Sequence, residues 1–503
     1  MSDATPSTPA RPVVKSLSDR AGFLIIANLV KYAVGFVLPM VLVRLLTKND
    51  YGSYQQMILI GTAISGVLTL GLPTSVYYFY HGSERMPSLV AQTTLMLAAS
   101  GVVGTLIVFF GADHFASLLN NESATSLLKI YACSLMFMIG SEHCMDSMIA
   151  QGRYRAAVTF EIGETFVRVC TLLAPLWLGY GFTGLIAGLV TYSVLRYVGR
   201  VSFQLIGSGL DFSGWRKHVF LREQLDYSVP VALVSLVGWI GGTLNRGMLA
   251  AAFSPARYAI YAVGALEIPV DVIFQASVSN VLRASLPPLI RDGNLAEVTR
   301  IIREASRKLS IIVLPSFVFL FGYSYEFITV LFTSRYEESV SVFRIFLWMM
   351  PLNMLVLSSI PHAFGKPKFN LYIVAATTGL LVALGYTLLK TIGFYGPAIA
   401  AVTTQYVQVS AYLLVVRKLT KSSIRQLLPL AHILRVLLAA AAALLVSRQV
   451  DHLTAWGLTN LAICGLTFSV TFFAAAAPIG VFSRQDIQLI KRWMGKILRI
   501  QLS

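Results

Sequence analysis

Charged residues are scarce in this chain. Asp, Glu, Lys and Arg together make up 13% of its 503 residues, against about 25% in an average soluble domain. Hydrophobic residues account for 56%, which excludes a soluble globular protein. The scarcity of charge therefore predicts an integral membrane protein.

Cysteine is also rare, with four residues in the whole chain. Cys133, Cys144, Cys170 and Cys464 all fall inside apolar runs without metal-ligand or redox spacing, so we interpret them as packed apolar residues. The glycine-rich phosphate loop of ATPases and the HExxH zinc motif are both absent from the sequence. We therefore expect no enzyme activity, no metal and no bound cofactor.

What the chain does contain is a series of apolar runs of about 20 residues, long enough to cross a bilayer as α-helices. The shorter alternating segments of a β-barrel are not seen, so the predicted fold class is all-α. Fourteen spans are predicted, near residues 21–43, 53–79, 88–111, 126–150, 156–178, 182–206, 227–252, 258–282, 309–332, 341–363, 369–391, 395–416, 430–447 and 453–477.

Lys and Arg are distributed unevenly between the two sides of these spans. If both termini lie in the cytoplasm, the inner segments hold 28 of the 40 Lys and Arg residues and the outer segments hold eight. Such an excess is typical of cytoplasmic loops. The same rule explains most of the net charge of +17, so no nucleic acid is expected as a partner.

Three short motifs occur twice, in the same order, at offsets of 207, 213 and 212 residues. They pair Tyr51-Gly52-Ser53-Tyr54 with Tyr258-Ala259-Ile260-Tyr261, Gly152-Arg153-Tyr154-Arg155 with Gly365-Lys366-Pro367-Lys368, and Gly181-Phe182-Thr183-Gly184 with Gly393-Phe394-Tyr395-Gly396. An even number of spans per repeat would give the two halves the same orientation. Many transporters build a central, alternately exposed cavity from such repeats.

The duplication predicts the domain organisation. It consists of a cytoplasmic tail at 1–20, a first six-span lobe at 21–206, a cytoplasmic linker at 207–226, a second lobe at 227–418 that includes an interfacial helix at 294–308, two further spans within 419–478, and a cytoplasmic amphipathic helix at 479–503. Both amphipathic helices resemble those that bind anionic headgroups. Packing on the protein's own loops explains their pattern equally well.

Ten charged residues fall within predicted spans. At the bilayer centre each costs about 2.5–3.5 kcal/mol on insertion scales, so they must pair, face a hydrated cavity or lie near the end of a span. They are Lys31, Glu142, Asp146, Glu161, Glu164, Arg168, Arg246, Glu267, Asp271 and Arg283.

The first half carries most of the acids. Glu142 and Asp146 share a face of the fourth span, while Glu161, Glu164 and Arg168 share a face of the fifth. Glu164 also precedes Arg168 by four residues, the favourable orientation for an ion pair within a helix. One hypothesis is a structural network of ion pairs, and the other is coupling of transport to H⁺ or Na⁺.

Lys31 and Arg246 are isolated cations in the opening spans of the two halves. Neither has an acid within one helical turn, so each is expected to face a cavity or an acid on another helix. Glu267 and Asp271 of the eighth span are candidate partners for Arg246. Arg283 is placed at the cytoplasmic mouth of the bundle.

Several segments resemble the polysaccharide transporter (Wzx-type) flippases. The run Val43-Arg44-Leu45-Leu46-Thr47-Lys48-Asn49-Asp50-Tyr51-Gly52-Ser53-Tyr54 is similar to the junction of their first two spans, and Leu68-Thr69-Leu70-Gly71-Leu72-Pro73 to the end of the second. The basic glycine turns after spans four and ten, and the Gly-x-x-Gly motifs before spans six and twelve, are also similar. The resemblance covers at least residues 15–418.

This resemblance implies two six-helix lobes in a V, as in multidrug and toxic-compound extruders of the MOP superfamily, plus two C-terminal helices. It implies a protein of the bacterial inner membrane that moves undecaprenyl-diphosphate-linked oligosaccharide outward by alternating access, for O-antigen, capsule or exopolysaccharide synthesis. Lys31, Arg246 and Arg283 would line the cavity for the diphosphate and sugar. Membrane lipids, a polysaccharide polymerase and chain-length proteins are the implied partners.

Three other functions are weighed against this one. A lipid II flippase of the same superfamily usually has several arginines early in its first two spans, where this chain has Lys31. A multidrug cation antiporter would favour an acidic cavity over Lys31. A membrane polysaccharide polymerase usually carries a long, arginine-bearing outer loop, and the predicted outer loops are all short.

Overall fold

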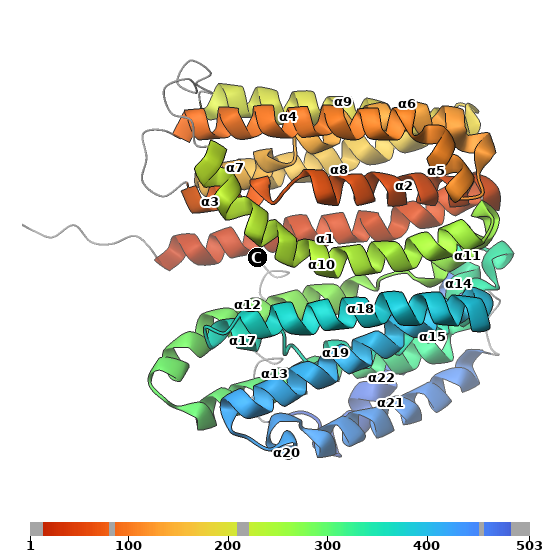
Figure 1. The fold of residues 1–503 in the computed structure, drawn as a ribbon. Helices are drawn as coiled ribbons and strands as arrows, with labels where there is room; N and C mark the ends of the chain where they lie inside the picture. Colours follow the sequence, from red (N-terminus) through yellow and green to blue (C-terminus); the bar gives the residue numbers. More distant parts are fainter. Residues whose placement is uncertain (1–13, 80–85, 209–220, 452–456, 484–503) are drawn as a thin grey trace, which may run out of the picture. The chain divides into compact units, whose positions relative to one another are not determined.

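The computed structural model describes residues 14–79, 86–208, 221–451 and 457–483, which form helices and connecting turns without a β-strand among them (Figure 1). The chain divides into two compact units. Unit 1 comprises Met1–Leu46 and Gln56–Leu236, and unit 2 comprises Thr47–Gln55 and Val237–Ser503.

Unit 1 is built around long helices that pack side by side, with α4, α6 and α9 in one layer and α8 against both α9 and α1 (Figure 1). Its helices are α1 (Val14–Leu45), most of α2 (Lys48–Leu68), α3 (Leu72–Phe79), α4 (Met86–Phe110), α5 (Ala112–Leu118), η1 (Glu122–Ala124), α6 (Thr125–Gly140), α7 (His143–Ala150), α8 (Tyr154–Trp177), α9 (Gly181–Ser208) and the first half of α10 (Leu221–Ala252).

Small residues let these helices approach closely. A Cβ atom on Gly188 of α9 would lie 2.0 Å from the backbone oxygen of Thr171 on α8. A Cβ atom on Gly101 of α4 would lie 2.7 Å from the backbone oxygen of Met136 on α6. Close backbone contact at small residues is the usual way in which helices associate within a membrane.

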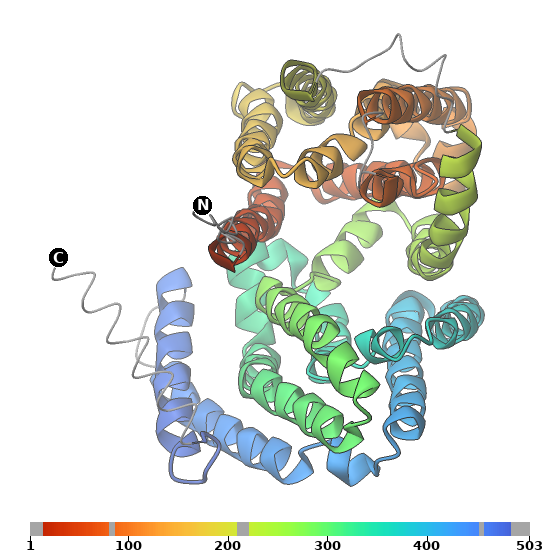
Figure 2. The same ribbon diagram turned by 90° about the vertical axis from the view of Figure 1, so that its left-hand side faces the viewer.

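Unit 2 contains the remaining helices, among which α18 packs on α19, and α21 packs on both α22 and α13. Figure 2 shows α21 and α22, in blue, at one edge of this unit. The helices are the second half of α10, α11 (Pro255–Gly264), α12 (Pro269–Arg291), α13 (Leu295–Gly322), α14 (Ser324–Phe332), η3 (Ser334–Tyr336), α15 (Ser339–Leu347), α16 (Met350–Asn353), α17 (Ser359–Ala363), α18 (Lys368–Thr391), η4 (Gly393–Tyr395), α19 (Gly396–Thr420), α20 (Ile424–Leu427), α21 (Leu430–Asp451) and α22 (Leu458–Ala476).

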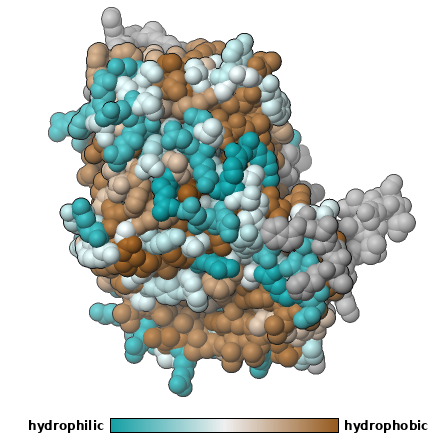
Figure 3. All heavy atoms as spheres, turned by 90° about the vertical axis from the view of Figure 1, so that its right-hand side faces the viewer, coloured by the Kyte–Doolittle hydropathy of each residue, from teal (hydrophilic) through white to brown (hydrophobic). Residues whose placement is uncertain are grey.

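By length and apolar composition, eight helices of the described residues can span a membrane. The pair α11 and α12, bent by 54° at its break, would make a ninth. Leu434, Leu438 and Leu445 on α21 are between 59% and 70% exposed, as expected where a helix meets lipid. Broad hydrophobic areas are visible beside hydrophilic clusters in Figure 3. The prediction of an all-α, multi-pass membrane protein is confirmed, while the count of fourteen spans stays a prediction.

Several predicted spans are interrupted rather than continuous. In the second predicted span, α2 ends at Leu68 and α3 begins at Leu72, because Leu70 and Gly71 adopt positive φ angles of 48° and 66°. A Cβ atom on Gly71 would also lie 2.8 Å from the backbone oxygen of Ser228. The fourth span divides into α6 and α7, the eighth into α11 and α12, and the tenth into α15, α16 and α17.

The prediction of a separate interfacial helix at 294–308 is wrong. These residues form the first half of α13, which continues without a break to Gly322. Val298, Ile302 and Leu309 on its apolar face are at most 2% exposed, and α12, α20 and α21 are among the helices that pack on α13. The apolar face is therefore covered by protein, as the alternative explanation of its pattern required.

The boundaries of the other predicted segments also differ from the structure. Helix α1 begins at Val14, inside the predicted tail of 1–20, and residues 1–13 lie outside the described part. Helix α10 begins at Leu221, inside the predicted linker of 207–226, whose residues 209–220 are not described. Of the predicted C-terminal helix at 479–503, residues 484–503 are likewise outside the described chain.

The first half of α10 belongs to unit 1 because of a polar contact that a hydropathy pattern does not reveal. Gln224 is fully buried, and its Nε2 atom donates to Ser75 Oγ and to Thr93 Oγ1, each at 2.8 Å. Its Oε1 atom accepts from Gln92 Nε2 at 3.2 Å. These bonds hold the start of α10 against α3 and α4, so the division between units falls at Leu236 instead of 207–226.

The two Tyr-x-x-Tyr motifs lie together in unit 2. A Cβ atom on Gly52 would lie only 1.8 Å from the backbone oxygen of Pro255, so glycine is required in the first motif. Tyr51, Tyr258 and Tyr261 are all buried here. This packing explains why Thr47–Gln55 belongs to unit 2.

Helix α21 is tied to the rest of unit 2 by its residue Arg448. Its Nη1 atom donates to Glu326 Oε1 at 2.6 Å and to Asp451 Oδ2 at 2.8 Å. The guanidinium also lies 4.0 Å from the ring centroid of Tyr323. Three elements, α13, α14 and α21, therefore meet at one side chain.

Candidate functional site

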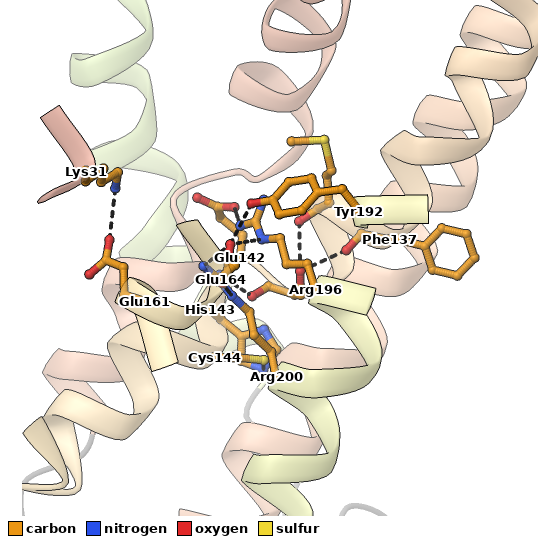
Figure 4. A network of polar contacts seen from close by, with 12 residues as sticks. Lys31, Phe137, Glu142, His143, Cys144, Glu161, Glu164, Tyr192, Arg196 and Arg200 are labelled. Atoms are coloured by element: carbon orange, nitrogen blue, oxygen red, sulfur yellow. Dashed lines mark hydrogen bonds and ion pairs between the residues drawn. The ribbon is translucent and has the colours of Figure 1, made fainter. Parts of the chain in front are cut away.

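Unit 1 contains a network of ionised side chains within its bundle of long helices, and this network is the candidate site. We call it the charged network, and it consists of Lys31 on α1, Glu142 before α7, Glu161 and Glu164 on α8, and Arg196 and Arg200 on α9 (Figure 4). Three carboxylates balance three cations, so the network is neutral as a whole.

Glu164 is the centre of the buried part. Its Oε1 atom accepts from the Tyr192 hydroxyl at 2.7 Å, and its two oxygens accept from Arg200 Nε at 2.8 Å and Nη2 at 3.2 Å. Arg196 Nε lies 3.3 Å from the same carboxylate. The side chains of Glu164, Arg196 and Arg200 are only 8–9% exposed. A two-point pairing of this kind fixes the direction of both groups.

The break between α6 and α7 supplies two more acceptors to this centre. Glu142, which stands at the break, accepts from Arg196 Nη2 at 2.7 Å and is 48% exposed. The backbone oxygen of Ser141 accepts from Arg200 Nη1 at 3.1 Å. Since an interrupted helix leaves carbonyl groups unpaired, the break offers a place where a buried guanidinium can complete its hydrogen bonds.

His143, the next residue, is fully buried but serves packing. Its Nε2 atom lies 2.9 Å from Thr94 Oγ1, which itself donates to the backbone oxygen of Val90 at 2.8 Å. The hydroxyl can therefore only accept from His143, so Nε2 is the donor of this hydrogen bond. This bond attaches α7 to α4.

Lys31 forms the accessible edge of the network. Its Nζ atom lies 3.1 Å from Glu161 Oε1, and the two side chains are 62% and 22% exposed. Figure 4 shows this pair to one side of the cluster around Glu164. Of the two expectations for Lys31, an acid on another helix is the one that the structure provides.

The prediction that Glu164 forms an ion pair with Arg168 is wrong. Glu164 turns to α9 instead, where two arginines and a tyrosine meet it. No acid lies within ion-pair distance of Arg168 in the described part of the chain, although its charge acts on Tyr192. Asp146 is half-buried on α7, while Glu142 precedes that helix, so the fourth span does not present the two acids on one continuous helix.

Arg196 and Arg200 are the network residues that the sequence reasoning missed. Both fall inside the predicted span at 182–206, yet the tally of Lys and Arg assigned them to the cytoplasmic loop. A usable signal was present, because Tyr192, Arg196 and Arg200 recur every four residues and share one face of a helix. Two arginines on one face of a span require acidic partners.

The charged residues of unit 2 do not form a comparable network. Arg246 is exposed and close enough to Tyr258 and Tyr261 for its charge to act on them, but no ion pair is found for it among the described residues. The predicted partners lie elsewhere: Glu267 is exposed, and Asp271 accepts from Asn353 Nδ2 at 2.5 Å.

The remaining predicted cavity residue, Arg283, is exposed on α12. Within the described ranges no three His, Cys, Asp or Glu residues gather as they would around a metal ion. The chemistry available in these helices is therefore that of ionised groups, hydroxyls and amides.

The two parts of the charged network differ in what they can do. In the buried part, removal of one partner would leave an uncompensated charge, at a cost of about 3–5 kcal/mol. An accessible pair such as Lys31 and Glu161 is worth only about 0–1 kcal/mol. The buried part is thus a rigid support that joins α7, α8 and α9, whereas Lys31 can exchange its carboxylate for another anion at little cost.

A family model described as a polysaccharide biosynthesis protein matches residues 41–341. None of the curated proteins matches the sequence. Among solved structures, the lipid II flippase MurJ in an inward closed conformation is similar to the chain with a TM-score of 0.70 at 14% identity, over 92% of this chain and 98% of that one.

Two transporters of the MOP superfamily are similar as well. An inward-facing multidrug resistance MATE family transporter has a TM-score of 0.59 at 13% identity, over 82% of this chain and 96% of its own. A MOP superfamily transporter from Pyrococcus furiosus has a TM-score of 0.57 at 13% identity, over 81% of this chain and 97% of its own. These likenesses establish the fold, and the family model covers more than half of the sequence, so the chain belongs to the polysaccharide biosynthesis protein family.

Proposed function

We propose that this protein is a flippase that moves an oligosaccharide linked through a diphosphate to undecaprenol across the bacterial inner membrane by alternating access. The family membership supports a role in building polysaccharide, and the fold is one that lipid and drug transporters use. Both termini would be cytoplasmic, as the distribution of Lys and Arg favours. A polymerase and chain-length proteins would act on the delivered units.

The observation that carries this proposal is the exposure of Lys31. An ammonium group in the middle of the first predicted span, 62% exposed and held by one carboxylate, is a suitable ligand for an incoming anion. A diphosphate bears more negative charge than Glu161 and offers more acceptor oxygens. It would therefore displace Glu161 from Lys31 while the network around Glu164 keeps the helices in place.

Arg246 and Arg283 extend the same argument to unit 2. Both guanidinium groups are exposed, and for neither is an ion pair found within the described residues. We assign them to binding of the anionic part of the substrate, at different stages of its passage. The sugar would be held by hydroxyl and amide groups.

The experiment is transport by purified protein in liposomes that contain a fluorescent oligosaccharide-diphosphate-undecaprenol. We expect Lys31→Ala to lose at least tenfold in rate and Lys31→Arg to keep most of it, because the positive charge is what the diphosphate recognises. Lys129→Ala is the matched control, since Lys129 pairs with Asp113 at 3.2 Å on the surface of the same unit.

Equal rates for the Lys31→Ala variant and the wild-type protein would remove Lys31 from the substrate path. The same liposomes distinguish the other candidates. Faster movement of lipid II than of the oligosaccharide lipid would favour a lipid II flippase, and exchange of organic cations in place of either lipid would favour a drug antiporter.

A further inference from the structure

Two interrupted spans of unit 2 meet around one buried carboxyl group. Helix α11 ends at Gly264 and α12 begins at Pro269, with their axes bent by 54°. A second interruption separates α16, which ends at Asn353, from α17, which begins at Ser359. Helix α12 packs on both α16 and α17. Broken helices with unwound backbone are the places where membrane transporters hold coupling ions.

Asp271 lies at this junction, in the first turn of α12, and is 5% exposed. Its Oδ2 atom accepts from Asn353 Nδ2 at 2.5 Å, whereas its Oδ1 atom is buried without a hydrogen-bond partner. No cation pairs with Asp271 among the residues described. An ionised carboxylate is poorly accommodated in such surroundings, and a protonated carboxyl group is accommodated much better.

Other charges near α12 are directed elsewhere. Helix α16 contributes Asn353 and no titratable group, and the only titratable residue of α17, His362, is exposed. Helix α13 carries its charges in its first half, where Glu297 pairs with Arg300, Glu304 pairs with Arg307 and Lys308, and Arg303 is exposed. On α12 itself Arg283 stands 12 residues beyond Asp271, about 18 Å along the helix. Arg291 is farther still, and Glu267 in the preceding turn is exposed.

Two influences on Asp271 oppose each other. The positive end of the α12 dipole and the amide of Asn353 stabilise the ionised form. Burial and the absence of a partner for Oδ1 stabilise the protonated form. Because no charged side chain of the described residues pairs with Asp271 and decides between the two forms, a change in access of water to the break can shift the balance.

We propose that Asp271 is a proton-binding site, which takes up one proton on its carboxylate when buried and releases it when the break between α11 and α12 opens to water. The binding of the proton stands on the geometry alone. Its use to drive transport rests on the proposed function. The unwound segments on either side are the parts of the chain that can move without breaking a long helix.

Infrared difference spectroscopy tests the site without any transport. Purified protein in lipid is titrated from acidic to alkaline pH, and the C=O stretch of a protonated carboxyl group is followed. We expect a band that titrates in the wild-type protein, disappears in Asp271→Asn, and remains in Glu267→Gln, which removes the exposed acid between α11 and α12. In Asn353→Val the band should persist to higher pH, because the donor that favours the ionised form is gone.

Two results would overturn the proposal. One is a spectrum in which Asp271→Asn removes no titrating band, although the variant elutes as the folded wild-type protein does. The other is a band that Na⁺, but not K⁺, abolishes at constant pH, which would make the site a sodium site.

The transport arm separates this proposal from the proposed function. A pH gradient should accelerate flipping by the wild-type protein and by Glu267→Gln, and Asp271→Asn should lose this acceleration. Flipping by the wild-type protein that ignores the pH gradient would refute the coupling role of Asp271 and leave the flippase standing. Absence of any flipping, with the infrared band present, would refute the flippase and leave the proton site standing.

Discussion

Replacing Glu164 by Gln should destabilise unit 1 far more than the same replacement of Glu161. When Glu164 loses its charge, the carboxylate of Glu142 is the one that remains for both Arg196 and Arg200. The side chains of these two arginines are 9% and 8% exposed. One buried guanidinium is then uncompensated, which costs about 3–5 kcal/mol. Glu161 belongs to a pair with the 62% exposed Lys31, and loss of such a pair costs about 0–1 kcal/mol.

Thermal unfolding of detergent-solubilised protein measures this difference. In a unit of this size each kcal/mol changes the melting temperature by about 2–4 °C, so Glu164→Gln should lower it by about 6–20 °C. The fraction of a fluorescent fusion protein that remains monodisperse after heating gives the melting temperature.

A double variant makes the test specific to charge. Glu164→Gln combined with Arg200→Gln removes one charge of each sign and leaves the pair of Glu142 with Arg196. We expect this protein to melt above the Glu164→Gln variant, since neighbouring groups of one network do not act additively. Equal, small shifts for the Glu161 and Glu164 variants, or a fully additive double variant, would refute the role assigned to the buried network.

Three further predictions concern unit packing and substrate binding. Gly52→Ala should lower the melting temperature, because its Cβ atom would lie 1.8 Å from a backbone oxygen, whereas Gly163→Ala, with no atom within 4 Å, should leave it unchanged or raise it. Glu326→Gln should make α21 more accessible to protease, because it removes one of the two carboxylates that hold Arg448; wild-type protection would contradict this. Arg246→Ala should slow flipping in liposomes at an unchanged melting temperature, and a normal rate would exclude it from the substrate path.

The helical character and the membrane setting could be predicted from the sequence because both depend on local composition. In the described part of the chain each predicted span overlaps one or more helices, since about 20 apolar residues are sufficient to identify such a segment. The motif glycines were also informative. Gly52 and Gly71 occupy positions where a side chain would collide with the backbone oxygens of Pro255 and Ser228.

The interruptions could not be predicted, because they depend on contacts between distant segments. Nothing in the apolar run around Ser141 distinguishes it from continuous helix, yet its backbone oxygen accepts from Arg200, which lies 59 residues further along. Likewise, the amphipathic pattern at 294–308 predicts an apolar face but not what covers it. In the structure this face is buried within the protein, and the helix continues without a break to Gly322.

Partners of the charged residues were predicted least well, since the choice of partner depends on how helices are rotated toward one another. Local spacing favoured Arg168 for Glu164, but α9 presents Tyr192, Arg196 and Arg200 to the same carboxylate. Proximity in sequence also suggested Asp271 as the ion-pair partner of Arg246. In the structure Asp271 accepts a hydrogen bond from the side-chain amide of Asn353 instead.

The central claim is that the protein moves a lipid-diphosphate oligosaccharide between leaflets, and one measurement tests it most directly. Liposomes with the labelled lipid in the inner leaflet are prepared with and without the purified protein. The appearance of the lipid in the outer leaflet is followed by its accessibility to an impermeant quencher. We predict rapid, protein-dependent appearance that is lost in Lys31→Ala. The same slow rate with and without the wild-type protein would contradict the account.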